Sequence, residues 1–244
     1  MSVEHATTAN GQDRPDKLES LLACSLCDGI PKRLAAHIVS RCRLEHAARG
    51  ETVWSAGVDS RFFAIVADGI VRLSRRSVQG REITVEVLGP GSCAGILATL
   101  AGTRYPLTAT AITDAWYLKV PRELWGELRD GHDDFRERAL AEMGRRLLHG
   151  FDFMSALLAG DVEQRLATAV LRVHDLLESR SGNVLPVTRQ HLAEIASVTV
   201  ESAIRVTSRW QQRGWIDSGY RHLTLKDKEA LRDLLTHSPR ASKA

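Results

Sequence analysis

Apolar residues recur at helical spacing towards the C-terminal end of the chain, in residues 188–220. They form two short stripes, Leu192, Ile195 and Ala196, then Ala203, Val206 and Trp210. The three residues 197–199 between the stripes suffice for a sharp turn, and the Thr199 hydroxyl can cap the second helix. A small hairpin, with its turn at Ser218-Gly219, is expected next. This pattern predicts a helix-turn-helix whose second helix fits a DNA major groove.

Between residues 43 and 120 the pattern changes to short β-branched runs separated by glycines. It predicts strands at 51–55, 62–67, 70–77, 82–88, 107–112 and 115–120. Strands at roughly ten-residue spacing favour a sandwich or barrel-like β-domain. Two short helices are expected before it, at 18–23 and 33–42.

A long helical segment follows Pro121, and its apolar residues lie three or four positions apart. They are Leu140, Met143, Leu147, Phe151, Met154 and Leu158. Two parallel helices of a homodimer can share such a seam, or one amphipathic helix can pack on its own β-domain. We favour the dimer, because helix-turn-helix proteins commonly read DNA in pairs. Further helices are expected at 161–177 and 226–236.

The composition places the chain among ordinary globular proteins. Of its 244 residues, 43% are hydrophobic and 26% are charged. No apolar run approaches the roughly 20 residues that cross a bilayer, and the N-terminus lacks a signal-peptide pattern. We therefore expect a cytoplasmic protein. The net charge of +3 falls within residues 161–244, which hold 13 basic and 10 acidic residues, a weak sign of a polyanionic partner.

The cysteines are the other candidate chemistry. Cys24, Cys27, Cys42 and Cys93 are not expected to form structural disulfides in the cytoplasm. The remaining roles for these cysteines are buried free thiols, metal or cluster ligands, and redox sensing. No nucleophile elbow, phosphate loop or acid pair is found, so we do not expect an enzyme.

Two stretches carry a resemblance to a known family. They are DGIVRLSRRSVQGREITVEVLGPGSCAGILATLAG at 68–102 and LPVTRQHLAEIASVTVESAIRVTSRW at 185–210. With the intervening helix, the chain resembles the CRP/FNR family of bacterial transcription regulators over about residues 18–235. The resemblance implies an α+β fold with a tail at 1–16, a β-roll (cyclic-nucleotide-binding-like) sensor domain at 17–131, a dimerisation helix at 132–160 and a winged helix-turn-helix at 161–244.

The resemblance also implies a homodimer that reads an inverted-repeat DNA site, with RNA polymerase as a further partner. The family's acidic and basic base readers fall on Glu201 and Arg205, beside Val200 and Ile204. Arginine can bind guanine and glutamate can accept from cytosine, although the two side chains can also pair with each other. Residues expected at the DNA backbone are Thr188, Arg189, Gln190, Thr199 and Arg209. FNR-like members commonly have serine where this chain has Ile204.

Cyclic-nucleotide-binding members hold the ribose with a glutamate and the phosphate with an Arg-Ser pair. At the matching positions this chain has Ile96, after Gly95, and Tyr105-Pro106. A buried phosphate without its arginine is costly, so cAMP is not expected as the effector.

FNR itself holds an oxygen-labile 4Fe–4S cluster on N-terminal cysteines plus one in the β-domain. The cysteine count here matches, which makes Cys24, Cys27, Cys42 and Cys93 candidate cluster ligands, but their spacing differs and the family's β-domain ligand falls near Tyr117. Haem on a histidine such as His37 or His46, direct thiol oxidation and no cofactor stay open.

The sequence thus predicts a regulator controlled by a redox or gas (O2/NO) signal sensed in its N-terminal part. A cyclic-nucleotide-responsive or effector-independent CRP-like regulator, and a non-DNA regulatory module, are the alternatives.

Overall fold

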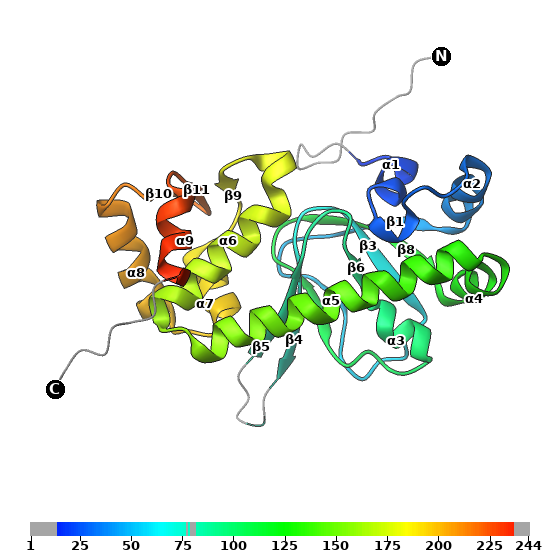
Figure 1. Ribbon diagram of the computed structural model, residues 1–244, viewed down its shortest axis with the longest axis horizontal. Helices are drawn as coiled ribbons and strands as arrows, with labels where there is room; N and C mark the ends of the chain where they lie inside the picture. Colours follow the sequence, from blue (N-terminus) through cyan, green and yellow to red (C-terminus); the bar gives the residue numbers. More distant parts are fainter. Residues whose placement is uncertain (1–13, 77, 79–81, 237–244) are drawn as a thin grey trace, which may run out of the picture. The chain divides into compact units, whose positions relative to one another are not determined.

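The computed structural model describes residues 14–76, 78 and 82–236 (Figure 1). Most of the expected N-terminal tail, the end of the strand expected at 70–77 and the last eight residues lie outside the described part. The chain forms two compact units, Met1–Leu73 with Leu88–Arg145 and Ser74–Val87 with Arg146–Ala244. Among the described residues, no helix combines the length and the apolar character that crossing a membrane requires.

The first unit begins with three short helices. They are α1 (Lys17–Leu22), the 3-10 helix η1 (Ser25–Cys27) and α2 (Lys32–Arg41). The Asp16 carboxylate caps α1 by accepting hydrogen bonds from the amides of Leu18 at 2.8 Å and Glu19 at 2.9 Å. The helices predicted at 18–23 and 33–42 are therefore confirmed, shifted by one residue.

Two four-stranded sheets form the β-domain. One has the order β1 (Arg43–Ala47), β8 (Ala115–Pro121), β3 (Phe62–Asp68) and β6 (Cys93–Ala94). The other has the order β2 (Thr52–Trp54), β7 (Thr108–Ala111), β4 (Val71–Arg76) and β5 (Glu82–Leu88). All six predicted strands are present, whereas β1 and β6 were not predicted. Two helices, α3 (Ile96–Ala101) and α4 (Arg122–Gly131), complete this region.

Strand β3 supplies both apolar cores of the β-domain. Its side chains alternate, so that Phe63 and Ile65 join the cluster that contains α1, η1 and α2. Ala64 and Val66 join the second cluster, with Trp54. A strand buried on both faces reads as a continuous apolar run, as FFAIVA does here.

Helix α5 (Asp133–Ala159) spans 27 residues and contributes to both units. After it come α6 (Val162–Ser181), β9 (Val184–Leu185), α7 (Arg189–Ala196), α8 (Val200–Gln212), β10 (Ile216–Gly219), β11 (His222–Leu225) and α9 (Lys228–Thr236). Helix α6 packs on α7 and α9, and the small sheet has the order β10-β11-β9. These elements form a winged helix-turn-helix.

The turn of the wing is displaced from its predicted position. Gly219 pairs with His222, so the two-residue loop is Tyr220-Arg221 and not Ser218-Gly219. Arg221 has φ of 63°, a left-handed conformation that only a minority of non-glycine residues adopt. Tyr220 is 87% exposed at this tip.

Candidate DNA-reading surface and thiol cluster

The helix-turn-helix is fixed by caps on both helices. Thr188 caps α7 by accepting a hydrogen bond from the His191 amide at 3.2 Å, and Thr199 caps α8 by accepting one from the Ser202 amide at 3.2 Å. Between them, Ser197 ends α7 with φ of 51° and ψ of 45°. The predicted turn at 197–199 is therefore confirmed.

An arginine that the sequence did not reveal braces this turn. Arg165, on α6, donates from Nε to the Ala196 carbonyl at 2.9 Å and from its terminal nitrogen to the Ser197 carbonyl. A cation at the C-terminal end of α7 satisfies carbonyls that the helix leaves without partners. Its position 31 residues before Ala196 gave no local signal in the sequence.

The two faces of α8 differ sharply. Ala203, Val206, Thr207 and Trp210 are buried. On the other face, Val200 is 39% exposed and Ile204 is 45% exposed, and Glu201 and Arg205 are exposed beside them. Within the described residues, neither charged side chain makes an ion pair or hydrogen bond, even with the other. The i, i+4 pair that the sequence left open is therefore not formed.

The residues predicted at the DNA backbone have partners within the protein. Arg189 donates from Nε to the Thr207 hydroxyl at 3.0 Å, and Gln190 donates to the Glu194 carboxylate at 3.2 Å. Arg209 is paired with Glu163 at 3.1 Å. These contacts orient the three side chains.

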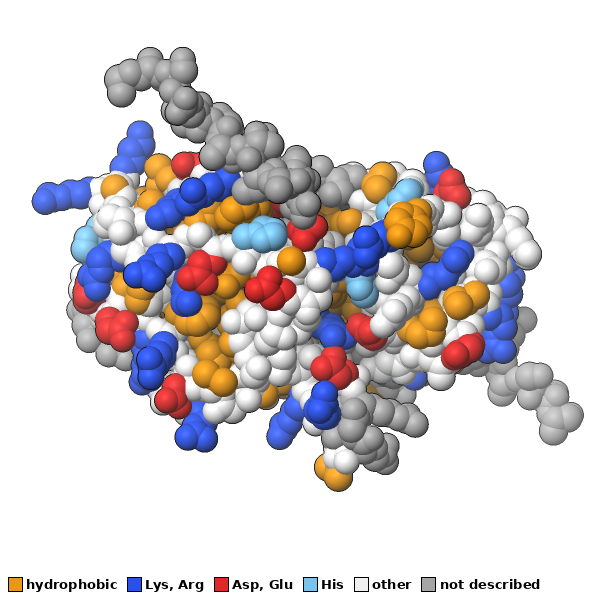
Figure 2. All heavy atoms as spheres, turned by 180° about the vertical axis from the view of Figure 1, so that it is seen from behind, with side chains coloured by type: hydrophobic (Ala, Val, Ile, Leu, Met, Phe, Trp, Pro, Cys, Tyr) orange, Lys and Arg blue, Asp and Glu red, His pale blue; other side chains and the backbone are white. Residues whose placement is uncertain are grey.

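Glu163, near the start of α6, joins that helix to the end of α8. Its carboxylate accepts hydrogen bonds from the Trp210 indole at 2.8 Å and from Arg209 at 3.1 Å, and Arg213 lies 4.0 Å away. The sequence did not point to Glu163, because its partners lie more than 45 positions farther along the chain. Figure 2 shows basic and acidic side chains interspersed over one face of the protein, in keeping with the small net charge.

The predicted seam on α5 is largely exposed. The exposed fractions are 64% for Leu140, 59% for Leu147, 50% for Phe151, 50% for Met154 and 87% for Leu158. Leu148, which was not part of the predicted seam, is also 62% exposed. Solitary apolar side chains are common on protein surfaces, whereas these exposed side chains follow one another along a single helix.

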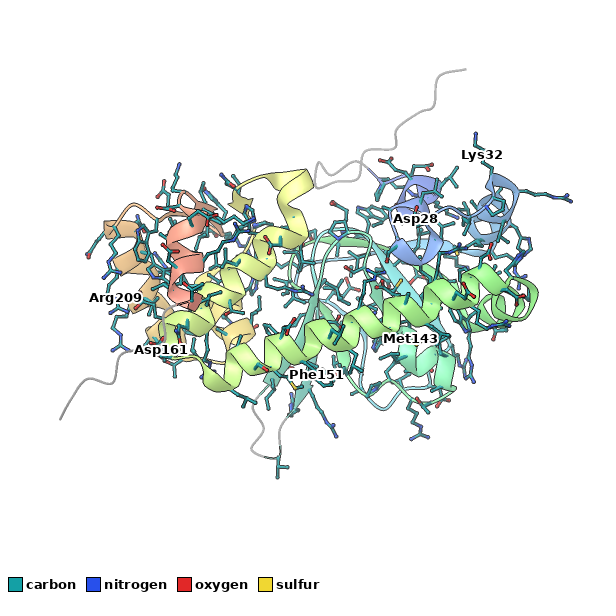
Figure 3. All side chains as sticks on the ribbon, in the orientation of Figure 1. Asp28, Lys32, Met143, Phe151, Asp161 and Arg209 are labelled. Carbon is teal, nitrogen blue, oxygen red and sulfur yellow. The ribbon has the colours of Figure 1, made fainter. Side chains whose placement is uncertain are left out.

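Met143 departs from this row. It is half-buried and packs against the cluster that contains α1 and α2, whereas Gly144 beside it is exposed (Met143 and Phe151 are labelled in Figure 3). With Gly144 in place of Met143, the seam positions are spaced 4, 3, 4, 3 and 4, a regular heptad repeat. Gly144 therefore fits the heptad spacing of the exposed row better than Met143, which packs on the core of its own chain.

The β-domain carries apolar and aromatic side chains at the positions expected to contact a cyclic nucleotide. Tyr105, at the position of the family's phosphate arginine, is 1% exposed and stacks on Trp54 with ring centroids 4.5 Å apart. Its phenol donates to the Phe62 carbonyl, and burial raises the pKa of Tyr105 to about 12, which keeps it neutral. A Cβ on Gly95 would lie 2.9 Å from the Tyr105 ring, and Ile96 after it is buried. The side chain at the expected phosphate position thus packs within the aromatic core of the β-domain.

All four cysteines lie in one apolar core, the cluster that contains α1, η1 and α2. Cys24 precedes η1, Cys27 ends it, Cys42 follows α2, and Cys93 begins β6. None forms a disulfide, and each is at most 2% exposed. The sulfur atoms of Cys24 and Cys93 lie 3.1 Å apart, within hydrogen-bonding distance.

The thiols differ in acidity. Hydrogen bonds from Cys27 and then Cys93 hold the pKa of Cys24 well below its usual value. The hydrogen bond to Cys24 and burial raise the pKa of Cys27, which the nearby Arg138 partly offsets. The guanidinium Nε of Arg138 is buried without a hydrogen-bond partner. Burial raises the pKa of Cys42 to about 11. Among Cys24, Cys27 and Cys42, only Cys24 has a lowered pKa.

The proposed iron–sulfur ligand set does not fit this arrangement. Each cysteine of a 4Fe–4S cluster binds a different iron, so the ligand sulfurs surround the cluster, whereas Cys24 and Cys93 are in contact at 3.1 Å. Even around one tetrahedral zinc with bonds of about 2.3 Å, sulfurs lie about 3.8 Å apart. Among the described residues, no three His, Cys, Asp or Glu side chains are arranged to hold a metal ion. In this structure the four cysteines form a cluster of buried thiols within one apolar core.

The candidate haem ligands lie at the surface. The His37 side chain is 50% exposed and lies 3.7 Å from Glu127. His46 is exposed on β1 and packs edge-on against Trp116 with ring centroids 5.0 Å apart.

A β-domain, a long helix and a winged helix-turn-helix in this order define a DNA-binding transcriptional regulator. The chain belongs to the CRP/FNR family. Residues 44–132 match the cyclic nucleotide-binding domain, and residues 164–234 match the Crp-like helix-turn-helix domain.

Relatives of known function agree with this assignment. The CRP-like cAMP-activated global transcriptional regulator of Mycobacterium tuberculosis is 23% identical over 217 residues, covering 87% of this chain and 97% of that protein. The fumarate and nitrate reduction regulatory protein of Escherichia coli K12 is 22% identical, covering 78% of this chain and 77% of that protein. The structure of FixK2 from Bradyrhizobium japonicum has a TM-score of 0.71 at 21% identity, covering 79% of this chain and 96% of that one.

Proposed function

We propose that this regulator is a homodimer that reads an inverted-repeat DNA site through α8, under the control of a redox or gas (O2/NO) signal in its first unit. The observation that carries the DNA reading is the outward face of α8, where Glu201 and Arg205 are exposed and have no partner among the described residues. Charged groups that no protein contact satisfies are available to base edges.

Each side chain on this face has a base for which its chemistry is suited. Arg205 can donate two hydrogen bonds to O6 and N7 of guanine, and Glu201 can accept one from N4 of cytosine. Ile204 and Val200 offer apolar contact to the methyl group of thymine. A serine in the position of Ile204 would add a hydrogen bond, so we expect the outer half-site bases to differ from those of FNR-like members.

Phosphate contacts would set the register of α8 in the groove. Arg189 uses only Nε to reach Thr207 among the described residues, which leaves its terminal nitrogens for a phosphate. The capped N-terminal ends of α7 and α8, at Thr188 and Thr199, add backbone amides, and Gln190 is exposed beside them. Arg209 would exchange its ion pair with Glu163 for a phosphate.

The homodimer rests on the exposed α5 row, because a second copy would cover it. A two-fold pair also brings two α8 helices to one site, which an inverted repeat requires. A cytoplasmic location and RNA polymerase as a further partner belong to the same proposal, since the relatives are transcriptional regulators.

The decisive experiment selects bound sequences from random DNA duplexes at fixed salt, then compares variants on the selected site. Arg205→Ala should lose preference at one G·C pair in each half-site, with affinity about 5- to 150-fold weaker, the equivalent of about 1–3 kcal/mol. Arg232→Ala is the matched control, because this exposed arginine on α9 pairs with Glu229 at 2.7 Å. Unchanged sequence preference in Arg205→Ala would contradict the assignment of α8.

Signal control is tested separately. DNA affinity is compared for protein prepared without air and the same protein exposed to oxygen, nitric oxide or peroxide. Equal affinity in every state would reject redox or gas control and would leave the DNA reading intact.

A further inference from the structure

The first unit contains two sulfur atoms in direct contact that neither the fold nor the DNA surface requires. Cys24 and Cys93 approach to 3.1 Å although 69 positions separate them in the chain. Apolar packing alone does not bring two thiols together, because any small apolar side chain would fill the same space. A sulfur pair at this distance needs only about 1 Å of further approach to reach the 2.05 Å bond of a disulfide.

We infer that Cys24 and Cys93 form a reversible disulfide on reaction with a peroxide, and that this thiol pair is the sensing element of the first unit. The inference rests on the proposed function as far as control of DNA binding is concerned. The chemistry of the pair itself does not depend on it.

The reaction proceeds in two balanced steps. The Cys24 thiolate attacks one oxygen of hydrogen peroxide, the O–O bond breaks, and Cys24 becomes a sulfenic acid while hydroxide leaves and takes a proton as water. The Cys93 sulfur then attacks the Cys24 sulfur, the S–O bond breaks, and a second water leaves. Both sulfurs are oxidised by one electron each, and the peroxide receives the pair. A dithiol reductant reverses the change.

The neighbours of the pair favour these roles. Cys24 accepts from two thiols, which stabilises its thiolate, so it is suited to the first attack. Cys42 lies in the same cluster, but burial raises its pKa to about 11 and so holds it protonated. Cys27 keeps its proton because it donates to Cys24.

The two partners differ in how firmly they are held. Cys93 belongs to β6 and is registered opposite Ile65 of β3 in the sheet. Cys24 lies outside the sheet, in the turn between α1 and η1. Closure of the bond would therefore displace the Cys24 segment more than the sheet.

A hydrogen bond connects the Cys24 segment to helix α5. Ser25, next to Cys24, donates a hydrogen bond to Oε2 of Glu142 on α5 at 2.8 Å. The Glu142 carboxylate is 10% exposed and is also paired with Arg145. A nearly buried carboxylate that loses a hydrogen bond is destabilised unless it moves. The Glu142 turn of α5 would therefore respond to the state of the thiols, only two residues before the seam position at Gly144.

The closing experiment uses the full chain, purified without air and fully reduced. A few equivalents of hydrogen peroxide are added, remaining thiols are alkylated under denaturing conditions, and peptides are mapped by mass spectrometry without reductant. We expect a Cys24–Cys93 cross-linked peptide that dithiothreitol removes, with Cys27 and Cys42 still alkylated. Cys93→Ser and Cys24→Ser should abolish this peptide, while Cys42→Ser should retain it.

The wild-type measurement needs no variant, so a variant that fails to fold leaves the test intact. A Cys24–Cys27 bridge, uniform oxidation of all four cysteines, or no bridge would overturn the inference. Stoichiometric iron and sulfide in the anaerobic protein would also overturn it in favour of a cluster.

A second measurement, of DNA affinity, distinguishes the sensing role of the thiol pair from the DNA-binding function. Oxidation should change the affinity of wild-type protein for its selected duplex about 5- to 150-fold, the usual range of coupling between two sites, and should leave Cys93→Ser unchanged. A bridge without any change in affinity would overturn its sensing role. If neither the reduced nor the oxidised protein bound a specific DNA sequence, the proposed function would be contradicted, whether or not the disulfide forms.

Discussion

The Trp210 indole donates a hydrogen bond to the Glu163 carboxylate at 2.8 Å, so the first turn of α6 holds the last turns of α8. Trp210 is fully buried, and its only polar atom would otherwise lie in an apolar core. The same carboxylate pairs with Arg209 and lies near Arg213. Glu163 thus combines a core hydrogen bond with a surface ion pair.

Removal of this carboxylate should destabilise the C-terminal unit. Glu163→Ala leaves the buried Trp210 N–H without a partner, which we expect to lower the free energy of unfolding by about 1–3 kcal/mol. Glu163→Gln keeps an acceptor and should cost clearly less. Urea unfolding followed by tryptophan fluorescence measures both. Glu229→Gln, on an exposed ion pair, is the control, and an alanine variant no weaker than that control would contradict the role of Glu163.

The helix-turn-helix contains a second test, at Ser197. This residue has φ of 51°, a conformation that costs a residue with a side chain roughly 1–2 kcal/mol relative to glycine. Glycine also has more conformational freedom in the unfolded chain, which offsets part of the stability gained by relieving the strain. Ser197→Gly should therefore raise the free energy of unfolding by about 0.5–1 kcal/mol.

Ser208 provides a control of opposite sign. It lies inside α8, where glycine is the poorer helix former, so Ser208→Gly should destabilise by roughly 0.5 kcal/mol. Thermal unfolding of the two variants compares them directly. A decrease for Ser197→Gly would mean that its side chain makes a contact that outweighs the backbone strain.

The C-terminal unit shows what the sequence could and could not predict. The caps at Thr188 and Thr199 and the turn between α7 and α8 follow from local pattern, so the helix-turn-helix was predicted nearly to the residue. Glu163 and Arg165 act on residues more than 30 positions away, and no local pattern reveals such contacts.

The same distinction holds in the first unit. Strand β1 was missed because RLEHA has no apolar alternation, and its pairing with β8 depends on residues more than 60 positions away. The seam was assigned to Met143 because a glycine carries no hydrophobic signal, although Gly144 fits the heptad. The contact between Cys24 and Cys93 likewise depends on the fold, because the sequence shows only that both are cysteines.

The contribution of the hydrogen bond between Arg189 on α7 and Thr207 on α8 to stability can be measured by a double-mutant cycle. Arg189 donates to the hydroxyl of Thr207, which in turn donates to the Ala203 carbonyl at 2.7 Å. Arg189→Ala and Thr207→Val should each lower stability, and their combination should cost less than the sum by about 0.5–3 kcal/mol. Urea unfolding of the three variants gives the cycle, and strict additivity would show that the bond contributes nothing.

The aromatic filling of the β-domain predicts no response to cyclic nucleotides. A ligand at 100 times its Kd adds about 2.7 kcal/mol to the folded state, which would raise Tm by roughly 5–10 °C for a chain of this size. Because Tyr105 stacks on Trp54 at the expected phosphate position, we expect no shift with cAMP or cGMP at millimolar concentration. The cAMP-activated regulator of Mycobacterium tuberculosis is a suitable positive control, and a dose-dependent rise in Tm here would refute the expectation.

The exposed row on α5 makes the homodimer testable by charge. Phe151 is 50% exposed in the single chain, so Phe151→Glu should fold normally but place two carboxylates in a two-fold interface. We expect its dimer dissociation constant to rise at least about 100-fold, as for the loss of a central aromatic anchor. Sedimentation velocity over a range of concentrations measures this change.

Two further variants give the result its meaning. Asp152→Lys changes the charge at an exposed position next to Phe151 but outside the row, and should leave the dimer unchanged. Met143→Glu should instead destabilise the first unit, because Met143 packs on the core of its own chain. Equal dissociation of Asp152→Lys and Phe151→Glu would show that the charge on α5, and not this apolar row, governs association. If Phe151→Glu remained dimeric, another surface would have to join the two copies.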